Sequence, residues 1–261
     1  MDILQKIVAD KRVEVKLKKG LIPVSQLEAS VLFERTPISL ATKLQNSNAG
    51  IIAEHKRRSP SKAIINNDLS VSEVARGYED AGVSGMSVLT DGKYFGGSAE
   101  DLLLARASVD IPLLRKEFII DEYQIVEAKA IGADLVLLIA AILDRKQIEE
   151  LSLTAKRLGL EVLLEVHNEE ELERSIMPSL DLLGVNNRNL KTFEVDLNTS
   201  KELSTKIPED FIKVSESGIS NTSAIKDLRN YGFQGFLIGE NFMKTDNPGE
   251  SALEFINDLR S

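Results

Sequence analysis

The 261-residue sequence contains no cysteine, no tryptophan and only two histidines. Without cysteine there is no disulfide bond, no thiol nucleophile and no thiolate metal site. Two histidines cannot form a three-histidine metal centre, so we expect no metal site. We also expect no cofactor. Any catalysis must therefore use Lys, Glu, Arg, Asn and Ser side chains together with backbone amides.

Basic residues are in deficit, since 32 Lys and Arg stand against 41 Asp and Glu, and the formal net charge is −9. That balance argues against nucleic acid or an anionic membrane surface as a partner. No apolar run reaches the roughly 18 residues that span a bilayer. The N-terminal segment MDILQKIVADKRVEVKLKKG also lacks the uninterrupted apolar core of a secretory signal. We therefore expect a cytoplasmic protein.

From about position 50 onward, eight short apolar runs alternate with longer amphipathic stretches, a pattern typical of buried parallel strands and helices. The pattern predicts an α/β fold, an eight-stranded parallel (β/α)8 TIM barrel. A doubly wound open sheet is the alternative, but it often has a Gly-rich first turn, and no GxGxxG follows any run here. The predicted strands are 50–54, 85–90, 111–116, 133–139, 161–165, 180–186, 211–215 and 235–239, and the clearest helices are 71–81, 121–131, 145–158, 168–176 and 222–231.

Residues 1–48 precede the first predicted strand and are too long to be a mere tail. Leu4, Ile7 and Val8 form a helical stripe, and Val13, Val15 and Leu17 form a looser one. Pro23 interrupts this pattern, and residues 24–33 predict another short helix. We interpret 1–48 as a helical extension that packs on the barrel of residues 49–261 and closes one end of it, in one domain overall.

Polar side chains recur where five of the predicted strands end. Side chains alternate along a strand, so residues two apart share a face, and the chemistry of such barrels lies at the carboxyl ends of the strands. We therefore expect one mouth of the barrel to gather Glu54, Lys56, Lys116, Glu165, Asn186, Arg188 and Glu216. A solvated rim charge is an equal alternative for any one of them, but not for the whole set. A lysine near other positive charge there would have a lowered pKa and could act as an acid near neutral pH.

The loops after the first, seventh and eighth predicted strands have the composition of a phosphate site. Ser217-Gly218 and Gly239-Glu240 can present backbone amides, and Ser59 can add a hydroxyl. Barrels of this kind often bind phosphate after strands seven and eight. For each glycine, a tight turn is the alternative explanation.

Aromatic and histidine residues near the mouth are few. Phe95 and Phe118 can form an apolar wall for an aromatic ring. His55 lies between Glu54 and Lys56, so we expect it to point outward in a structural role. His167 follows Glu165 by two residues, and hydrogen bonding within a loop is the favoured interpretation.

Seven segments, in order between about positions 50 and 245, resemble indole-3-glycerol phosphate synthase: IIAEHKRRSPSK, SVLTDGKYFGGS, IPLLRKEFIIDEYQI, LLEVHNEEEL, GVNNRNLKTFEVDL, KVSESGIS and FLIGENFM. The helical N-terminus is similar to that of the family as well. The resemblance implies a metal-free carbon–carbon lyase of tryptophan synthesis that converts 1-(2-carboxyphenylamino)-1-deoxyribulose 5-phosphate to indole-3-glycerol phosphate. It also implies a monomer or weak dimer with a small phosphorylated substrate, with other enzymes of tryptophan synthesis as candidate partners.

The resemblance implies roles for individual residues. Lys116 falls on the family's principal general acid, Glu165 on its second acid/base group, and Glu54 and Lys56 on its paired Glu and Lys. The resemblance also implies that the substrate is contacted by Asn186, Arg188, Glu216 and Ser217. It implies that the phosphate is held by Ser59, Gly218, Gly239 and Glu240.

Two other functions remain open from the sequence. A sister barrel such as phosphoribosylanthranilate isomerase shares the fold and the phosphate site, but it typically uses a cysteine, which this chain lacks. A non-catalytic sensor of a phosphorylated ligand would need the phosphate loops, but it would have no reason to keep Lys56, Lys116 and Glu165 together.

Overall fold

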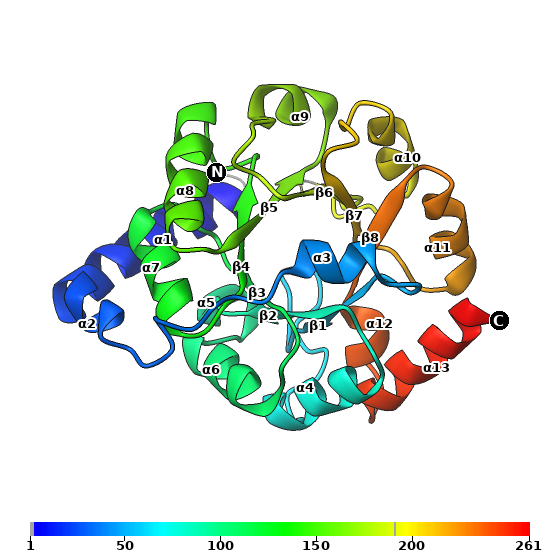
Figure 1. The fold of residues 1–261 in the computed structure, drawn as a ribbon, viewed down its shortest axis with the longest axis horizontal. Coiled ribbons are helices and arrows are strands. Elements are labelled where there is room, and N and C mark those ends of the chain that lie inside the picture. Colours follow the sequence, from blue (N-terminus) through cyan, green and yellow to red (C-terminus); the bar gives the residue numbers. More distant parts are fainter. Residues whose placement is uncertain (1–2, 191) are drawn as a thin grey trace.

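The computed structural model describes residues 3–190 and 192–261. Its strands form a closed, all-parallel barrel in chain order, in which β1 pairs with both β2 and β8 (Figure 1). The predicted (β/α)8 barrel is therefore confirmed. The strands are β1 (Ile51–His55), β2 (Gly85–Leu89), β3 (Leu113–Lys116), β4 (Leu135–Ile139), β5 (Glu161–Val166), β6 (Leu182–Asn186), β7 (Ile212–Glu216) and β8 (Phe233–Ile238).

Helices surround the ring of strands, and the predicted ones end within two residues of their expected limits. They are α1 (Ile3–Leu21), α2 (Val24–Glu28), α3 (Leu40–Gln45), α4 (Val71–Asp80), α5 (Gly92–Phe95), α6 (Ala99–Ser108), α7 (Glu122–Ala130), α8 (Arg145–Arg157), α9 (Glu169–Ser175), α10 (Asn198–Ser204), α11 (Thr222–Arg229), α12 (Glu240–Met243) and α13 (Pro248–Arg260). No helix in the described part of the chain has the length and apolar character that a membrane crossing needs.

The strands have two buried faces. Inward-facing residues such as Ile52, Leu114 and Leu163 fill the barrel interior, whereas Ile51, Val88 and Leu164 belong to the larger core between the strands and the helices. This two-sided burial explains why the strands read as continuous apolar runs. It also means that the inward positions at the carboxyl ends of the strands share one space.

The N-terminal segment contacts the barrel at both ends. The amino end of α3 lies on Glu161, whose carboxylate accepts hydrogen bonds from the backbone of Leu40 and Ala41 at 2.9 and 3.1 Å. In Figure 1, α3 lies across the centre of the strand ring, and α1 and α2 lie outside it beside α7. The strands start beside α3, so this helix closes the amino-terminal end of the barrel, as Leu40 and Leu44 enter the interior core.

Glycine makes this close approach possible at β2 and β8. A Cβ on Gly85 would lie 2.7 Å from Leu40 Cδ1, and one on Gly235 would lie 3.1 Å from Leu44 Cδ1. The same two Cβ atoms would also meet Pro112 O at 3.1 Å and Val214 Cγ2 at 2.8 Å, so these glycines fit close packing on more than one side.

Two details of the extension differ from the expectation. The second helix, α2, ends at Glu28 and not at residue 33. The prediction that Val13, Val15 and Leu17 form one apolar stripe was wrong, because Val13 and Leu17 are 61% and 62% exposed while Val15 is buried. The buried residues Ile7, Lys11 and Val15 recur every four positions, and the lysine among them hid this spacing from an apolar pattern.

Candidate active site

One cavity of about 320 Å³ opens at the carboxyl end of the barrel, and the charged residues predicted for the mouth line it. Register explains the convergence, because Glu54 lies beside Ser87 of β2 and Asn186 beside Glu216 of β7. The cavity brings together every candidate site residue of the sequence: Glu54, Lys56, Ser59, Phe95, Lys116, Phe118, Glu165, Asn186, Arg188, Glu216, Ser217, Gly218, Gly239 and Glu240.

Lys116 stands at the centre of the charged groups. Its Nζ lies 3.2 Å from Glu165 Oε2 and 2.5 Å from Glu216 Oε2. Burial disfavours the charged form of Lys116 and so lowers its pKa. The carboxylates of Glu216, Glu165 and Glu54 outweigh burial and raise the pKa of Lys116 above its ordinary value. The expected lowering of a lysine pKa was therefore wrong here, because carboxylates and not cations surround Lys116. This lysine stays protonated and can donate only to a strongly basic oxygen.

The two carboxyl groups beside Lys116 have pKa values shifted in opposite directions. Burial, reinforced by the charge of Glu165, raises the pKa of Glu216 to about 7 against the pull of Lys116. Burial also disfavours the Glu165 carboxylate, but Lys116 and His167 overcome it and lower the pKa of Glu165. Such a divergence between neighbouring carboxyl groups is typical of acid–base sites. Gly184 leaves room for Glu216, since a Cβ there would lie 2.4 Å from Glu216 Oε1.

A second ion pair lies at the end of β1. Lys56 Nζ is 2.7 Å from Glu54 Oε1, and Ser87 Oγ donates to Glu54 Oε2 at 3.3 Å. Burial opposes the charged form of Glu54, but Lys56 and Lys116 outweigh burial and lower its pKa. Lys56, which is 19% exposed, can leave this pair for an anion that enters the cavity.

One wall of the cavity is apolar. The rings of Phe95 and Phe118 lie 5.9 Å apart between centroids, with an interplanar angle of 39°. Ile3, Leu4 and Ile7 of α1 line the same cavity. Sequence reasoning placed Leu4 and Ile7 on a helix packed against the barrel but did not assign them to the site. The apolar stripe predicted that these residues are buried. Only the position of α1 in the structure showed that they line the cavity.

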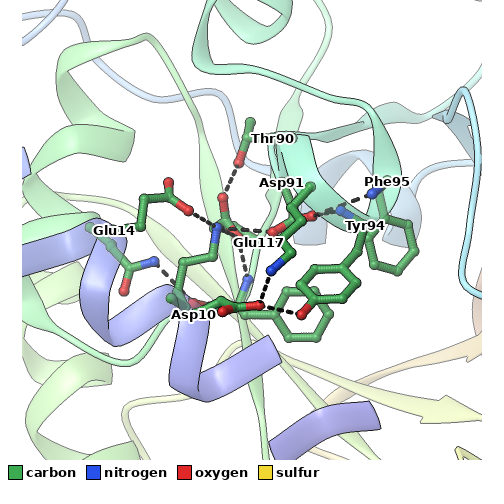
Figure 2. Close-up of polar contacts among 12 residues, drawn as sticks. Asp10, Glu14, Thr90, Asp91, Tyr94, Phe95 and Glu117 are labelled. Atoms are coloured by element: carbon green, nitrogen blue, oxygen red, sulfur yellow. Dashed lines mark hydrogen bonds and ion pairs between the residues drawn. The ribbon is translucent and has the colours of Figure 1, made fainter. Parts of the chain in front are cut away.

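A buried network fixes α1 to the loops that carry these two rings (Figure 2). Lys11, 2% exposed, lies 3.0 Å from Asp91 Oδ2 and 3.1 Å from Glu117 Oε1. Asp91 accepts from the backbone of Tyr94 and Phe95, while Glu117 accepts from the backbone N–H of Phe118 at 2.8 Å. The carboxylates that pair with Lys11 therefore also hold the backbone beneath both aromatic residues.

The loops after β1, β7 and β8 also line the cavity, through Ser59, Ser217, Gly218, Gly239 and Glu240. Ser217 and Gly218 both have left-handed backbone angles, with φ of 68° and 81°. For a serine this conformation costs energy, and such strain gathers at functional sites. The Glu240 carboxylate accepts a hydrogen bond from Lys62 Nζ at 2.9 Å.

Gly218 and Gly239 are poor positions for testing phosphate contact. A Cβ on Gly239 would lie 2.7 Å from Glu54 Oε1, and one on Gly218 would lie 2.3 Å from Val195 Cγ1. A side chain at either position would therefore disturb protein packing whether or not phosphate binds there. A local packing requirement therefore stands beside the phosphate interpretation for these glycines, in addition to the tight turn considered from the sequence.

The two histidines have different surroundings. His55 is 1% exposed and does not line the cavity, and burial together with the nearby Arg57 lowers its pKa to about 4. His167 does more than hydrogen-bond within a loop, because its Nε2 lies 3.3 Å from Glu165 Oε1. Within residues 3–190 and 192–261, no three His, Asp or Glu side chains form a group that could hold a metal ion.

Comparisons with known proteins agree over nearly the whole chain. A family model described as indole-3-glycerol phosphate synthase matches residues 4–255. A protein of that name from Bacteroides thetaiotaomicron is 49% identical over 259 residues, which cover 99% of each chain. Another from Dechloromonas aromatica is 43% identical over 252 residues, which cover 95% of this chain and 96% of the relative.

Two solved structures share the fold at low sequence identity. Thiamine phosphate pyrophosphorylase from Pyrococcus furiosus superposes with a TM-score of 0.62 and 16% identity, over 85% of this chain and 98% of that one. A structure described as native KDPGal superposes with a TM-score of 0.58 and 12% identity, over 82% of this chain and 94% of that one. These likenesses bear on the barrel alone.

Proposed function

The chain belongs to the indole-3-glycerol phosphate synthase family, and from that premise we propose that it converts 1-(2-carboxyphenylamino)-1-deoxyribulose 5-phosphate to indole-3-glycerol phosphate, carbon dioxide and water. The observation that carries the proposal is Lys116, held between Glu165 and Glu216 in a cavity with an apolar wall. An aromatic acid with a phosphorylated sugar chain fits a cavity of that composition.

Ring closure needs a proton donor at a ketone. The aromatic carbon that bears the carboxylate attacks the ketone carbon, and the carbonyl oxygen gains negative charge. Lys116 donates a proton to that oxygen, which becomes a hydroxyl group. A lysine with a raised pKa suits this step, since the forming alkoxide is a stronger base than the lysine amine.

Decarboxylation follows because the attacked ring carbon has lost its aromaticity. The bond to the carboxylate breaks, carbon dioxide leaves, and its electron pair restores the aromatic ring. Lys56 binds the carboxylate until that point, having exchanged its contact with Glu54 for the substrate. Phe95 and Phe118 pack against the aromatic ring.

Dehydration completes the indole. The new hydroxyl leaves as water after it takes a proton from an acid, and a base removes a proton from the adjacent carbon. Glu165 is the base in this proposal, since Lys116 and His167 keep it ionised, and one of the two lysines is the acid. Asn186 and Arg188 contact the substrate from the end of β6.

The phosphate group occupies the end of the cavity opposite the aromatic wall. Ser217, Gly218, Gly239 and Glu240 present backbone amides to it, and Ser59 adds its hydroxyl. No cofactor, nucleic acid or membrane takes part. The enzyme acts in the cytoplasm as a monomer or weak dimer, with other enzymes of tryptophan synthesis as candidate partners. The net charge of −9 supports the exclusion of anionic polymers.

A turnover assay tests this proposal. Purified protein is mixed with 1-(2-carboxyphenylamino)-1-deoxyribulose 5-phosphate, and indole formation is followed by fluorescence. The expected result is indole-3-glycerol phosphate with release of one carbon dioxide per product. Isomerisation of phosphoribosylanthranilate, or binding of the substrate without turnover, would overturn the proposal in favour of a sister isomerase or a sensor.

A further inference from the structure

His167 follows the last residue of β5 and shares the inward face of that strand with Glu165. Its Nε2 lies 3.3 Å from Glu165 Oε1, and its Nδ1 lies 3.1 Å from Glu171 Oε2 on α9. The ring is 10% exposed. The histidine thus stands between two carboxylates, one inside the cavity and one behind it, and does not itself line the cavity.

Glu171 is held in place from several sides. The backbone N–H of His167 donates to Glu171 Oε2 at 2.8 Å, and Asn168 Nδ2 donates to Glu171 Oε1 at 3.2 Å. Asn168 also caps α9 by accepting from the backbone N–H of Glu171 at 2.9 Å. The orientation of the His167 ring is therefore set by the start of α9.

The two oxygen atoms of Glu165 have different partners. Oε2 faces Lys116 Nζ at 3.2 Å, and Oε1 faces His167 Nε2 at 3.3 Å. A buried carboxylate with a cationic side chain beside each oxygen is held in place by its two ion pairs. We propose that His167 is a positioning residue for the ring-closing reaction, which holds Glu165 oriented and ionised while Lys116 serves the substrate. This inference rests on the proposed function.

Charge supports this role. The groups that face the His167 ring are Glu165 from β5 and Glu171 from α9; Lys116 of β3 reaches Glu165 from its other side, and Arg174 acts on Glu171. Burial disfavours the imidazolium, but the carboxylates of Glu165 and Glu171 outweigh burial and raise the pKa of His167 to about 10. His167 is therefore a cation at neutral pH.

The need for a second cation arises during the reaction. Lys116 turns from Glu165 to the substrate carbonyl and becomes neutral once it has given up its proton. Without another cation, the buried Glu165 would then gain a proton and could not act as the base in dehydration. His167 does not line the cavity, so in this proposal it gives no proton to the substrate and its charge persists through that step.

Proton NMR of the two histidines tests the contact without any turnover. The chain has only His55 and His167, so their ring signals are assigned by comparing wild type with His167→Gln. In the wild type we expect the His167 ring signal to titrate near pH 10. Glu171→Gln should lower that value by at least one pH unit, whereas Glu170→Gln, on an exposed neighbour in the same helix, should leave it unchanged. A His167 ring that titrates near its ordinary 6.5 in the wild type would overturn the proposal.

Kinetics test the role. His167→Gln keeps a hydrogen-bond donor but removes the charge, so kcat should fall about 10-fold, the low end for loss of a group that orients a reacting residue, with KM changed by less than threefold. The acid limb of the kcat profile should move to higher pH, since Glu165 loses a cation. Glu171→Gln should produce the same changes to a smaller extent, and Glu170→Gln should produce none.

The outcomes separate the two proposals. A wild type without turnover refutes the proposed function, while the NMR titration still decides the His167 contact. If His167→Gln and Glu171→Gln lower melting temperature but leave kcat and the pH profile unchanged, His167 is structural and the positioning role is refuted. If His167→Gln fails to fold, Glu171→Gln decides by the same measurements.

Discussion

At the scale of single residues, the site is a set of charges that adjust one another. Lys116 has a raised pKa because three carboxylates surround it, and Glu216 has a pKa of about 7 because burial favours its neutral form. Neither property belongs to the residue alone. The consequence is that a substitution at one position changes the protonation of its neighbours, and tests at this scale need a pH profile as well as a rate.

Lys116→Met should reduce kcat by at least about 100-fold, the low end for loss of a general acid. Methionine preserves much of the length and packing of the side chain, and Glu216 can take up a proton to offset the lost ammonium. Circular dichroism should therefore show an intact fold. Lys146→Met, at a position whose side chain is 84% exposed on α8, serves as the control and should retain full activity. Retention of a tenth of the wild-type kcat would exclude Lys116 as the acid.

At the scale of elements, α1 forms part of the lining of the candidate active site. Its first two turns line the cavity, and Lys11 joins it to the loops after β2 and β3. A buried ion pair adds little net stability, but removing one partner strands the other charge and is costly. The helix is thus coupled to the loops that carry Phe95 and Phe118.

Lys11→Met should lower the free energy of unfolding by about 3–5 kcal/mol, since it leaves Asp91 and Glu117 buried without their cation. Lys93→Met is a matched control on the same interface: Lys93 is 65% exposed and pairs with Asp10 of α1 at 2.6 Å. That change should leave the midpoint of urea denaturation nearly unchanged, because water screens an exposed ion pair. Urea denaturation of both variants measures the difference. Equal losses would show that Lys11 does not hold α1 in place.

At the scale of the whole molecule, stability depends on pH through the buried site. His167 and Glu216 bind protons more tightly in the folded state than in the unfolded state, whereas His55 binds them less tightly. Glu216 and His55 have opposite effects between about pH 4.5 and 6.5. Above pH 7, His167 is the group of these three that still titrates, which makes its contribution measurable.

The free energy of unfolding should fall between pH 7 and 10 in the wild type. In this range the unfolded chain has lost the His167 proton and the folded chain still holds it, so a rise in pH favours unfolding, by up to about 1.4 kcal/mol per pH unit. His167→Gln should show a flatter dependence over the same range. Urea denaturation at pH 7, 8 and 9 compares the two proteins. Parallel curves would mean that His167 carries no proton in the folded state at these pH values.

Activity should not depend on a divalent cation. The carboxylates of the cavity already face cations: Glu54 pairs with Lys56, and both Glu165 and Glu216 pair with Lys116. Prolonged dialysis against a chelator should leave the rate unchanged, with untreated protein as the control. A loss of rate that Mg²⁺ or Zn²⁺ restores would contradict this expectation.

The sequence by itself determined the barrel and the positions from which its chemistry could act. Apolar runs, helical periodicity and the alternation of side chains along a strand are local properties, so Glu54, Lys116 and Glu165 could be placed on inward faces before any contact was known. The resemblance then identified the family. The unexpected buried stripe on α1 shows the limit of this approach, since Lys11 interrupts the apolar pattern there.

Only the tertiary structure decided how these groups influence one another. The direction of the Lys116 pKa shift, the contact of His167 with Glu165 and Glu171, and the path that brings α1 to the cavity all depend on distances between elements far apart in the chain. Electrostatic interaction depends on separation in space and on burial, not on separation in sequence. Local patterns therefore predict which residues face the mouth, while the closed ring of strands decides which charge each one meets.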